Sequence, residues 1–151
     1  MSKPTPTQID PRGPRFGAAI TSLLLLVTVW LGLDATTQDA AFGLLVAITA
    51  LFAIGAIFGN SRHPYGWLFK MFVRPRLSAP KELEDPRPPQ FAQAVGLFVA
   101  AIGILLQLAG VEYGVAYAAG AAFIAAFLNA AFAYCLGCQI YLGLKRVGVI
   151  R

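Results

Sequence analysis

Four long stretches that are almost free of charge constrain this chain more than any other feature. They cover residues 16–33, 40–58, 91–109 and 115–144. A helix needs about 20 mostly apolar residues to cross a bilayer, so each stretch is long enough. The composition agrees, because 58% of the 151 residues are hydrophobic and 13% are charged, whereas soluble domains carry about 25% charged residues. The sequence therefore predicts an all-α membrane protein with four transmembrane helices.

The basic residues are distributed unevenly along the chain. The joints at 34–39 and 110–114 carry no lysine or arginine. Cytoplasmic segments of membrane proteins are rich in these residues, so we expect both termini and the middle loop in the cytoplasm. The net charge of +5 is then an orientation signal, and no nucleic-acid partner is expected. The twelve basic residues are Lys3, Arg12, Arg15, Arg62, Lys70, Arg74, Arg76, Lys81, Arg87, Lys145, Arg146 and Arg151.

An internal repeat divides the chain into halves. Residues 10–20 resemble residues 85–95 at an offset of 75 positions, with six identities in eleven. Each half then forms one helical hairpin, about 10–60 and about 90–144. Both hairpins have the same orientation, as in parallel repeats related by an axis along the membrane normal. The sequence predicts a single membrane domain over 1–151, with a cytoplasmic loop at about 61–89.

The middle loop contains a short amphipathic segment at 64–74. Apolar side chains recur at helical spacing on one face and basic side chains on the other, which is typical of a helix lying in the membrane surface. Tryptophan and tyrosine anchor such helices at the headgroups, and basic residues attract anionic lipids. The expected membrane-surface residues are Tyr65, Trp67, Lys70 and Arg74.

Cys135 and Cys138 form the only motif that suggests chemistry, and they are the only two cysteines in the chain. A pair at this spacing can cycle between dithiol and disulfide, carry a persulfide or bind a soft metal such as Cu(I). Zinc needs further ligands, which a second copy of the chain would supply. Without a secretory context we expect reduced thiols. We assign Cys138 as the more accessible thiol and Cys135 as the resolving one.

The depth of this pair depends on how the last span is interpreted. Hydropathy alone continues the span toward Leu144 and leaves the cysteines in the inner leaflet. The repeat instead aligns Phe58, where the second span ends, with Ala133, which places them at the cytoplasmic interface. An unbroken helix would put the thiols near a helix end that disfavours thiolate, whereas a break at Gly137 would start a new helix beside Cys138.

Several motifs together resemble one known family. They are Asp-Pro-Arg-Gly-Pro-Arg-Phe at 10–16, Pro-Tyr-Gly at 64–66, Arg-Pro-Arg at 74–76, Phe-Ala-Gln at 91–93, Phe-Leu-Asn-Ala at 127–130 and Cys-Leu-Gly-Cys at 135–138. The set resembles the bacterial integral-membrane family known as domain of unknown function 4395. The resemblance implies a bacterial plasma-membrane protein, and it associates the cysteine pair with thioredoxin-like or sulfurtransferase proteins.

These features support two hypotheses of function. In the first, Cys135 and Cys138 relay disulfide or sulfur with a thioredoxin-like or rhodanese-like partner. In the second, the chain is a structural or accessory membrane subunit, or a small transporter, with inert cysteines. No cofactor is assigned, enzymatic activity is left open, and the chain is compatible with a homo-oligomer.

Overall fold

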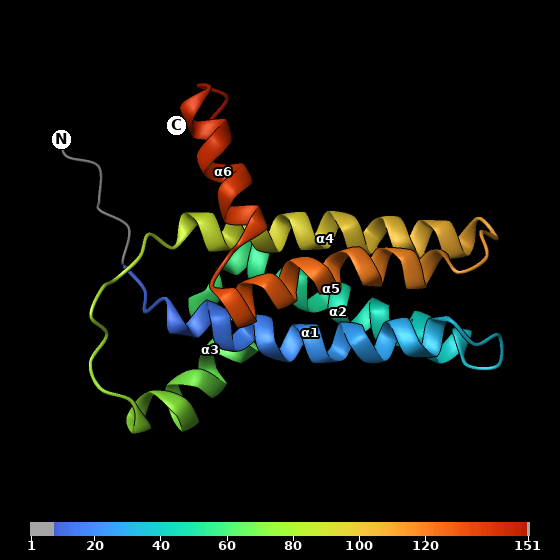
Figure 1. Ribbon diagram of the computed structural model, residues 1–151, viewed down its shortest axis with the longest axis horizontal. Helices are drawn as coiled ribbons and strands as arrows, with labels where there is room; N and C mark the ends of the chain where they lie inside the picture. Colours follow the sequence, from blue (N-terminus) through green and yellow to red (C-terminus); the bar gives the residue numbers. More distant parts are fainter. Residues whose placement is uncertain (1–7, 151) are drawn as a thin grey trace.

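The computed structural model describes residues 8–150, which are helical apart from turns and one extended linker (Figure 1). Four long helices lie along one axis: α1 (Arg12–Gly32), α2 (Gln38–Phe58), α4 (Arg87–Leu108) and α5 (Gly114–Phe132). Each is long and apolar enough to cross a membrane. The described residues contain no β-strand. The prediction of an all-α chain with four helices long and apolar enough to cross a membrane is confirmed.

The four long helices pack as a bundle in which α1 lies mainly on α5 and α2 mainly on α4. Small residues allow the close approach on which helix association in membranes depends. At Gly103, for example, an added Cβ would lie 2.5 Å from the Cβ of Ala118. Large apolar side chains such as Trp30 and Phe98 stay exposed on the outside, where lipid would surround them. The buried core comprises Leu25, Ala41, Leu45, Ile48, Ala100, Val115, Ala119 and Ala122.

The two ends of the bundle differ in charge. One end holds the short turns 33–37 and 109–113, which carry no basic residue. The other end, here called the basic end, holds the starts of α1 and α4, the middle loop and the last helix (Figure 1). Every described lysine and arginine belongs to a segment at this end. Lys3 and Arg151 lie outside the described residues.

The middle loop begins with four short helical elements. A 3-10 turn, η1 (Asn60–Arg62), precedes α3 (Pro64–Leu68), which continues through a π-helical turn, η2 (Phe69–Val73), and a 3-10 turn, η3 (Arg74–Arg76). The predicted helix at 64–74 is therefore present, but its apolar face is divided. Phe69 is buried whereas Phe72 is 56% exposed, because a π-turn is wider than an α-turn and rotates the following residues.

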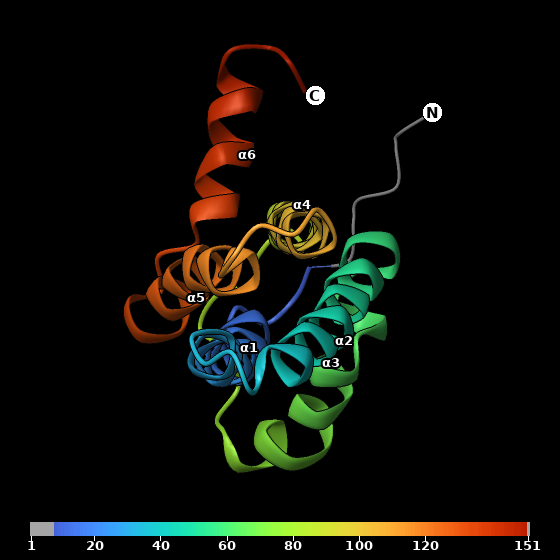
Figure 2. The same cartoon turned by 90° about the vertical axis from the view of Figure 1, so that its right-hand side faces the viewer.

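The last span ends earlier than hydropathy predicts. Helix α5 ends at Phe132, and Ala133 adopts a left-handed conformation with φ 56°. A new helix, α6 (Leu136–Arg146), then leaves the bundle sideways, on the side opposite α3 (Figures 1 and 2). The helix end agrees with the interpretation based on the repeat, which aligned Ala133 with the end of the second span. The predicted stretch 115–144 is thus two helices with different directions.

Candidate functional site

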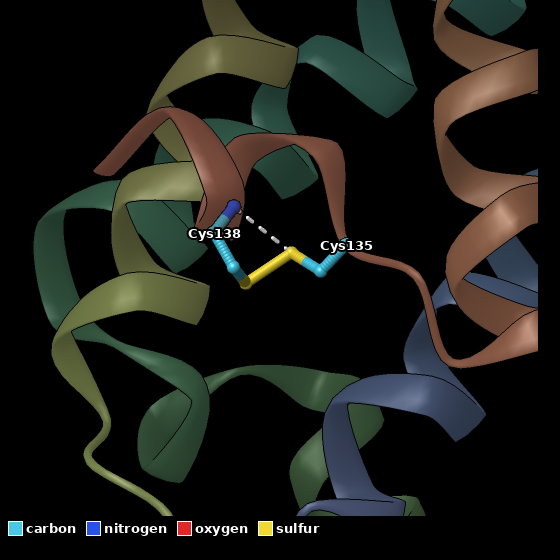
Figure 3. The surroundings of a disulfide bond; sticks show 2 residues. All are labelled: Cys135 and Cys138. Carbon is cyan, nitrogen blue, oxygen red and sulfur yellow. Dashed lines mark hydrogen bonds between the residues drawn. A yellow bond between two sulfur atoms is a disulfide. The ribbon is translucent and has the colours of Figure 1, made fainter. Parts of the chain in front are cut away.

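The two cysteines lie at the junction between α5 and α6. They form a disulfide, with their Cα atoms 5.1 Å apart (Figure 3). Reduced thiols are expected from the sequence, so the structure differs from that expectation. A disulfide between residues three apart needs a local departure from helical geometry. The chain meets this need because Cys135 is extended, at φ −89° and ψ 104°, and only Cys138 lies within α6.

Cys135 is the N-cap residue of α6. Its sulfur accepts a hydrogen bond from the backbone N–H of Cys138 at 3.1 Å, drawn as the dashed line in Figure 3. The first N–H groups of a helix have no partner within the helix, and a capping side chain satisfies one of them. An N–H directed at sulfur, together with the positive end of the helix dipole, stabilises negative charge on that sulfur. Both cysteine side chains are half-buried.

Helix α6 is fixed to the start of α4 along one face. The backbone of Gly137 approaches Ala92 so closely that an added Cβ would lie 2.5 Å from the Ala92 Cα. One turn later, the rings of Tyr141 and Phe91 are 5.6 Å apart, and Tyr141 is buried. Residues at four-residue spacing share a helix face, so this stripe determines the orientation of α6 and therefore the position of its cap.

Among the described residues, no further metal ligand lies with the two cysteines. Within residues 8–150, no group of three or more His, Cys, Asp or Glu side chains is gathered closely enough to hold a metal ion. A disulfide also offers no thiolate, which is the form that binds Cu(I) or zinc. The chemistry that the described residues support at this site is exchange between disulfide and dithiol.

The predicted membrane-surface residues lie elsewhere, around α3. Trp67 is 58% exposed, and Lys70 is also exposed. Tyr65 packs on Gly17 of α1, and the Arg74 guanidinium lies 3.5 Å from the Asp10 carboxylate. Because α3 and α6 lie on opposite sides of the bundle, these residues and the cysteines form two separate places at the basic end.

His63 is a structural residue at the entry to α3, and its position before Pro64 predicts this helix-entry place. It is the N-cap of α3 and is only 3% exposed. Its Nδ1 accepts a hydrogen bond from the Tyr65 N–H at 3.1 Å, and its Nε2 lies 2.9 Å from the Leu51 carbonyl oxygen, to which it donates. Burial lowers the pKa of His63. Its place directly before Pro64 is the signal in the sequence, because proline favours the first helical position.

Two Asp-Arg pairs stand at the starts of α1 and α4. Arg12 Nη2 lies 2.8 Å from Asp10, and the corresponding Arg87 atom lies 2.6 Å from Asp85. In both pairs the arginine backbone N–H also binds the carboxylate, at 3.0 and 2.9 Å. The hydrogen bond from its arginine lowers the pKa of each aspartate. In each Asp-Pro-Arg motif, the aspartate therefore accepts a backbone N–H at the first residue of a long helix.

A bundle of four helices that are each long and apolar enough to cross a membrane is typical of multi-pass membrane proteins, and its basic end carries a disulfide-bonded cysteine pair. The chain belongs to the family described as Domain of unknown function (DUF4395), whose model matches residues 9–146. No curated protein and no solved structure matches the chain.

Proposed function

We propose that the protein is a plasma-membrane thiol module whose Cys135 and Cys138 exchange a disulfide with a cytoplasmic thioredoxin-like or rhodanese-like partner. One observation carries the proposal: the pair is joined as a disulfide at the start of a helix, and the Cys135 sulfur accepts a backbone N–H. Such a pair can be opened and closed by thiol-disulfide exchange. The disulfide favours transfer of reducing equivalents over carriage of sulfane sulfur.

Charge distribution supports a cytoplasmic location of the site. The described basic residues all belong to the end of the bundle that carries α6. By the positive-inside rule this end, and with it both termini, faces the cytoplasm. Since α6 leaves the bundle sideways, we infer that the disulfide lies at the membrane interface, where a soluble partner can reach it.

We infer that the two hairpins are parallel repeats. Ile9 and Glu84, which are 75 positions apart, exchange two backbone hydrogen bonds of 2.9 and 2.8 Å. Reciprocal pairing of corresponding residues is what a two-fold axis through this bridge would give. The Asp-Arg pairs that follow these residues have matching geometry in both halves.

Contacts between helices support the same repeat. Arg15 donates to the carbonyl of Ala130 at 3.2 Å, and Gln90, 75 positions after Arg15, donates to that of Ala56 at 2.8 Å. Phe16 lies 5.9 Å from Phe69, as Phe91 lies beside Tyr141. By these contacts α6 corresponds to α3 at an offset of 72 positions, three fewer than at the helix starts. At this offset Cys135 occupies the capping position that His63 occupies in the first half.

Within this proposal, Cys135 attacks and Cys138 resolves, which reverses the assignment made from the sequence. The reduced Cys135 thiolate attacks a partner disulfide, forms a mixed disulfide and releases one partner thiolate. The Cys138 thiolate then attacks the Cys135 sulfur, closes the internal disulfide and releases the second partner thiolate. The pair is oxidised and the partner is reduced to a dithiol, and the reverse sequence reduces the pair. The N–H directed at Cys135 favours its thiolate in both directions.

Trapping in cells tests this proposal. The C138S variant keeps the attacking thiol and lacks the resolving one, so it should accumulate a mixed disulfide with a cytoplasmic protein that dithiothreitol releases. The C135S variant should accumulate little, and the double serine variant provides the background. No adduct from either single variant would support the hypothesis of inert cysteines in a structural subunit. An adduct from C135S alone would show that Cys138 attacks.

A further inference from the structure

A second place at the basic end has the features of a binding site. A cavity of about 130 Å³ lies between the start of α1 and the segment α3 to η3. It is separate from the disulfide, because α3 and α6 lie on opposite sides of the bundle (Figure 2). Gly13, Gly17 and Phe69 line its apolar part, and Asn60, Lys70 and Arg74 contribute polar groups. Concave, mostly apolar sites with a few convergent polar groups are typical of ligand sites.

Asn60, which lines this cavity, carries an unused donor. Its Nδ2 is buried and has no hydrogen-bond partner among the described residues. A buried polar group without a partner is destabilising, so such groups are rare in folded proteins. A rotation of the Asn60 side chain that opens this amide to the cavity would let a ligand oxygen accept from it.

The charges around the cavity favour an anion. Asp10 is its acidic residue, and Arg12 binds both Asp10 oxygens at 2.8 to 3.3 Å from outside the lining. Arg74 reaches the same carboxylate only at 3.5 Å, and Lys70 has no salt bridge to a described residue. Two cations therefore face the cavity while the single carboxylate is already neutralised.

The apolar part explains why the anion should be attached to a lipid. Gly13 has no side chain, so the space beside the Phe69 ring is left open. A Cβ added at Gly13 would lie 3.6 Å from the Cδ1 atom of that ring. The cavity also lies where α1 begins to span the membrane, at the level of lipid headgroups. An amphiphile would place its phosphate at Lys70, Arg74 and Asn60 and its glycerol and first methylenes beside Phe69.

We propose that this cavity is a specific site for the phosphate headgroup of an anionic phospholipid. The site differs from general attraction of basic residues to a charged surface, because it requires the cavity and the Asn60 amide as well as the charges. It does not depend on the thiol chemistry of Cys135 and Cys138, and each proposal can fail without the other.

Native mass spectrometry of the full-length protein in detergent tests the proposal, with phosphatidylglycerol as the probe and phosphatidylcholine as the neutral comparison. One phosphatidylglycerol should bind per chain. The variant K70Q/R74Q should bind it about tenfold more weakly or worse, because each glutamine keeps a neutral donor but loses the charge that makes such a hydrogen bond about twice as strong. The control R62Q/R76Q removes the same charge from the same loop outside the cavity lining, and its affinity should stay within about twofold.

Two further arms separate the site from simpler explanations. Gly13→Leu fills the apolar part without changing charge, and it should abolish phosphatidylglycerol binding while the thermal unfolding temperature stays near that of the wild type. Equal losses in K70Q/R74Q and R62Q/R76Q, or full binding by Gly13→Leu, would overturn the proposal in favour of surface attraction. Binding of inorganic phosphate alone with the same affinity would overturn the lipid assignment.

Discussion

Substituting Gly137 by alanine tests how α6, and with it the Cys135 cap, is held against α4. An added Cβ would lie 2.5 Å from the Ala92 Cα and 2.6 Å from the Ala92 Cβ. Carbon atoms pack at about 3.5–4.0 Å, so the two helices would have to separate by about 1 Å. The nearest atom belongs to the backbone of α4, which cannot turn aside as a flexible side chain can.

The expected magnitude follows from two opposing effects. Overpacking costs about 1–3 kcal/mol, whereas replacing glycine by alanine within a helix gains about 0.5–1 kcal/mol. Because the clash is with the backbone of α4, the overpacking cost lies in the upper half of its range, and Gly137→Ala should weaken the docking of α6 by about 1–2 kcal/mol. Gly143, on the same helix, has no atom within 4 Å of an added Cβ. Gly143→Ala should only gain, so the two variants should change α6 in opposite directions.

Amide hydrogen exchange over residues 138–146 measures this docking directly, because it reports the free energy of local opening. Gly137→Ala should speed exchange in this segment about fivefold to thirtyfold, and Gly143→Ala should slow it. A second substitution, Ala92→Gly, should restore little, because the closer of the two contacts is to the Ala92 Cα. The packing argument would be refuted by equal exchange rates in Gly137→Ala and Gly143→Ala.

Three further predictions concern two turns, the buried His63 and the Asp-Arg ion pairs at the basic end. Gly59→Ala should destabilise the protein by about 1–3 kcal/mol, because Gly59 has φ 78° and ψ 173°, a region open almost only to glycine. Ala133→Gly, at φ 56°, should be neutral or stabilising by up to about 1 kcal/mol. Thermal unfolding in detergent compares Gly59→Ala with Ala133→Gly, and equal losses of stability would contradict the strain argument. Since burial lowers the pKa of His63 below its ordinary value of 6.5, the unfolded chain takes up a proton first, so stability should fall as the pH drops below about 6.5. His63→Asn keeps a capping acceptor and should flatten this dependence between about pH 7 and pH 5; an unchanged slope would assign it to other groups. Asp10→Asn should destabilise the protein by about 1–2 kcal/mol, and Asp85→Asn by less than about 1 kcal/mol. The Asp10 side chain is 11% exposed and has two arginine partners, whereas the Asp85 side chain is 35% exposed and has one. Chemical denaturation at neutral pH compares the two variants, and the reverse order would contradict the assignment.

Much of the bundle can be predicted from the sequence, because bilayer thickness imposes a length that uncharged stretches reveal. The spans at 16–33 and 40–58 correspond to α1 and α2 within a few residues. The basic residues also fall at one end of the bundle, as expected from their positions before the first span, in the middle loop and after the last span. These features depend on local composition, which a single sequence contains.

The geometry of the cysteine site could be predicted only in part. Hydropathy averages over many residues, so it could not detect the left-handed Ala133 that ends α5 inside an apolar stretch. The repeat located this end, because Gly59 ends α2 at nearly the corresponding position. Which cysteine caps α6 depends on where that helix begins, and no residue type at 133–138 fixes the beginning in advance. The cavity near Lys70 arises from residues far apart in sequence.

Accessibility of the two thiols from each face of the membrane tests the central claim most directly. Membrane-impermeant maleimide is added to inverted vesicles and to intact spheroplasts, before and after reduction by thioredoxin. We predict labelling of Cys135 and Cys138 in inverted vesicles only, after reduction only, and protection again on reoxidation. Labelling from the outer face, or no labelling after reduction, would contradict a cytoplasmic thiol-disulfide module.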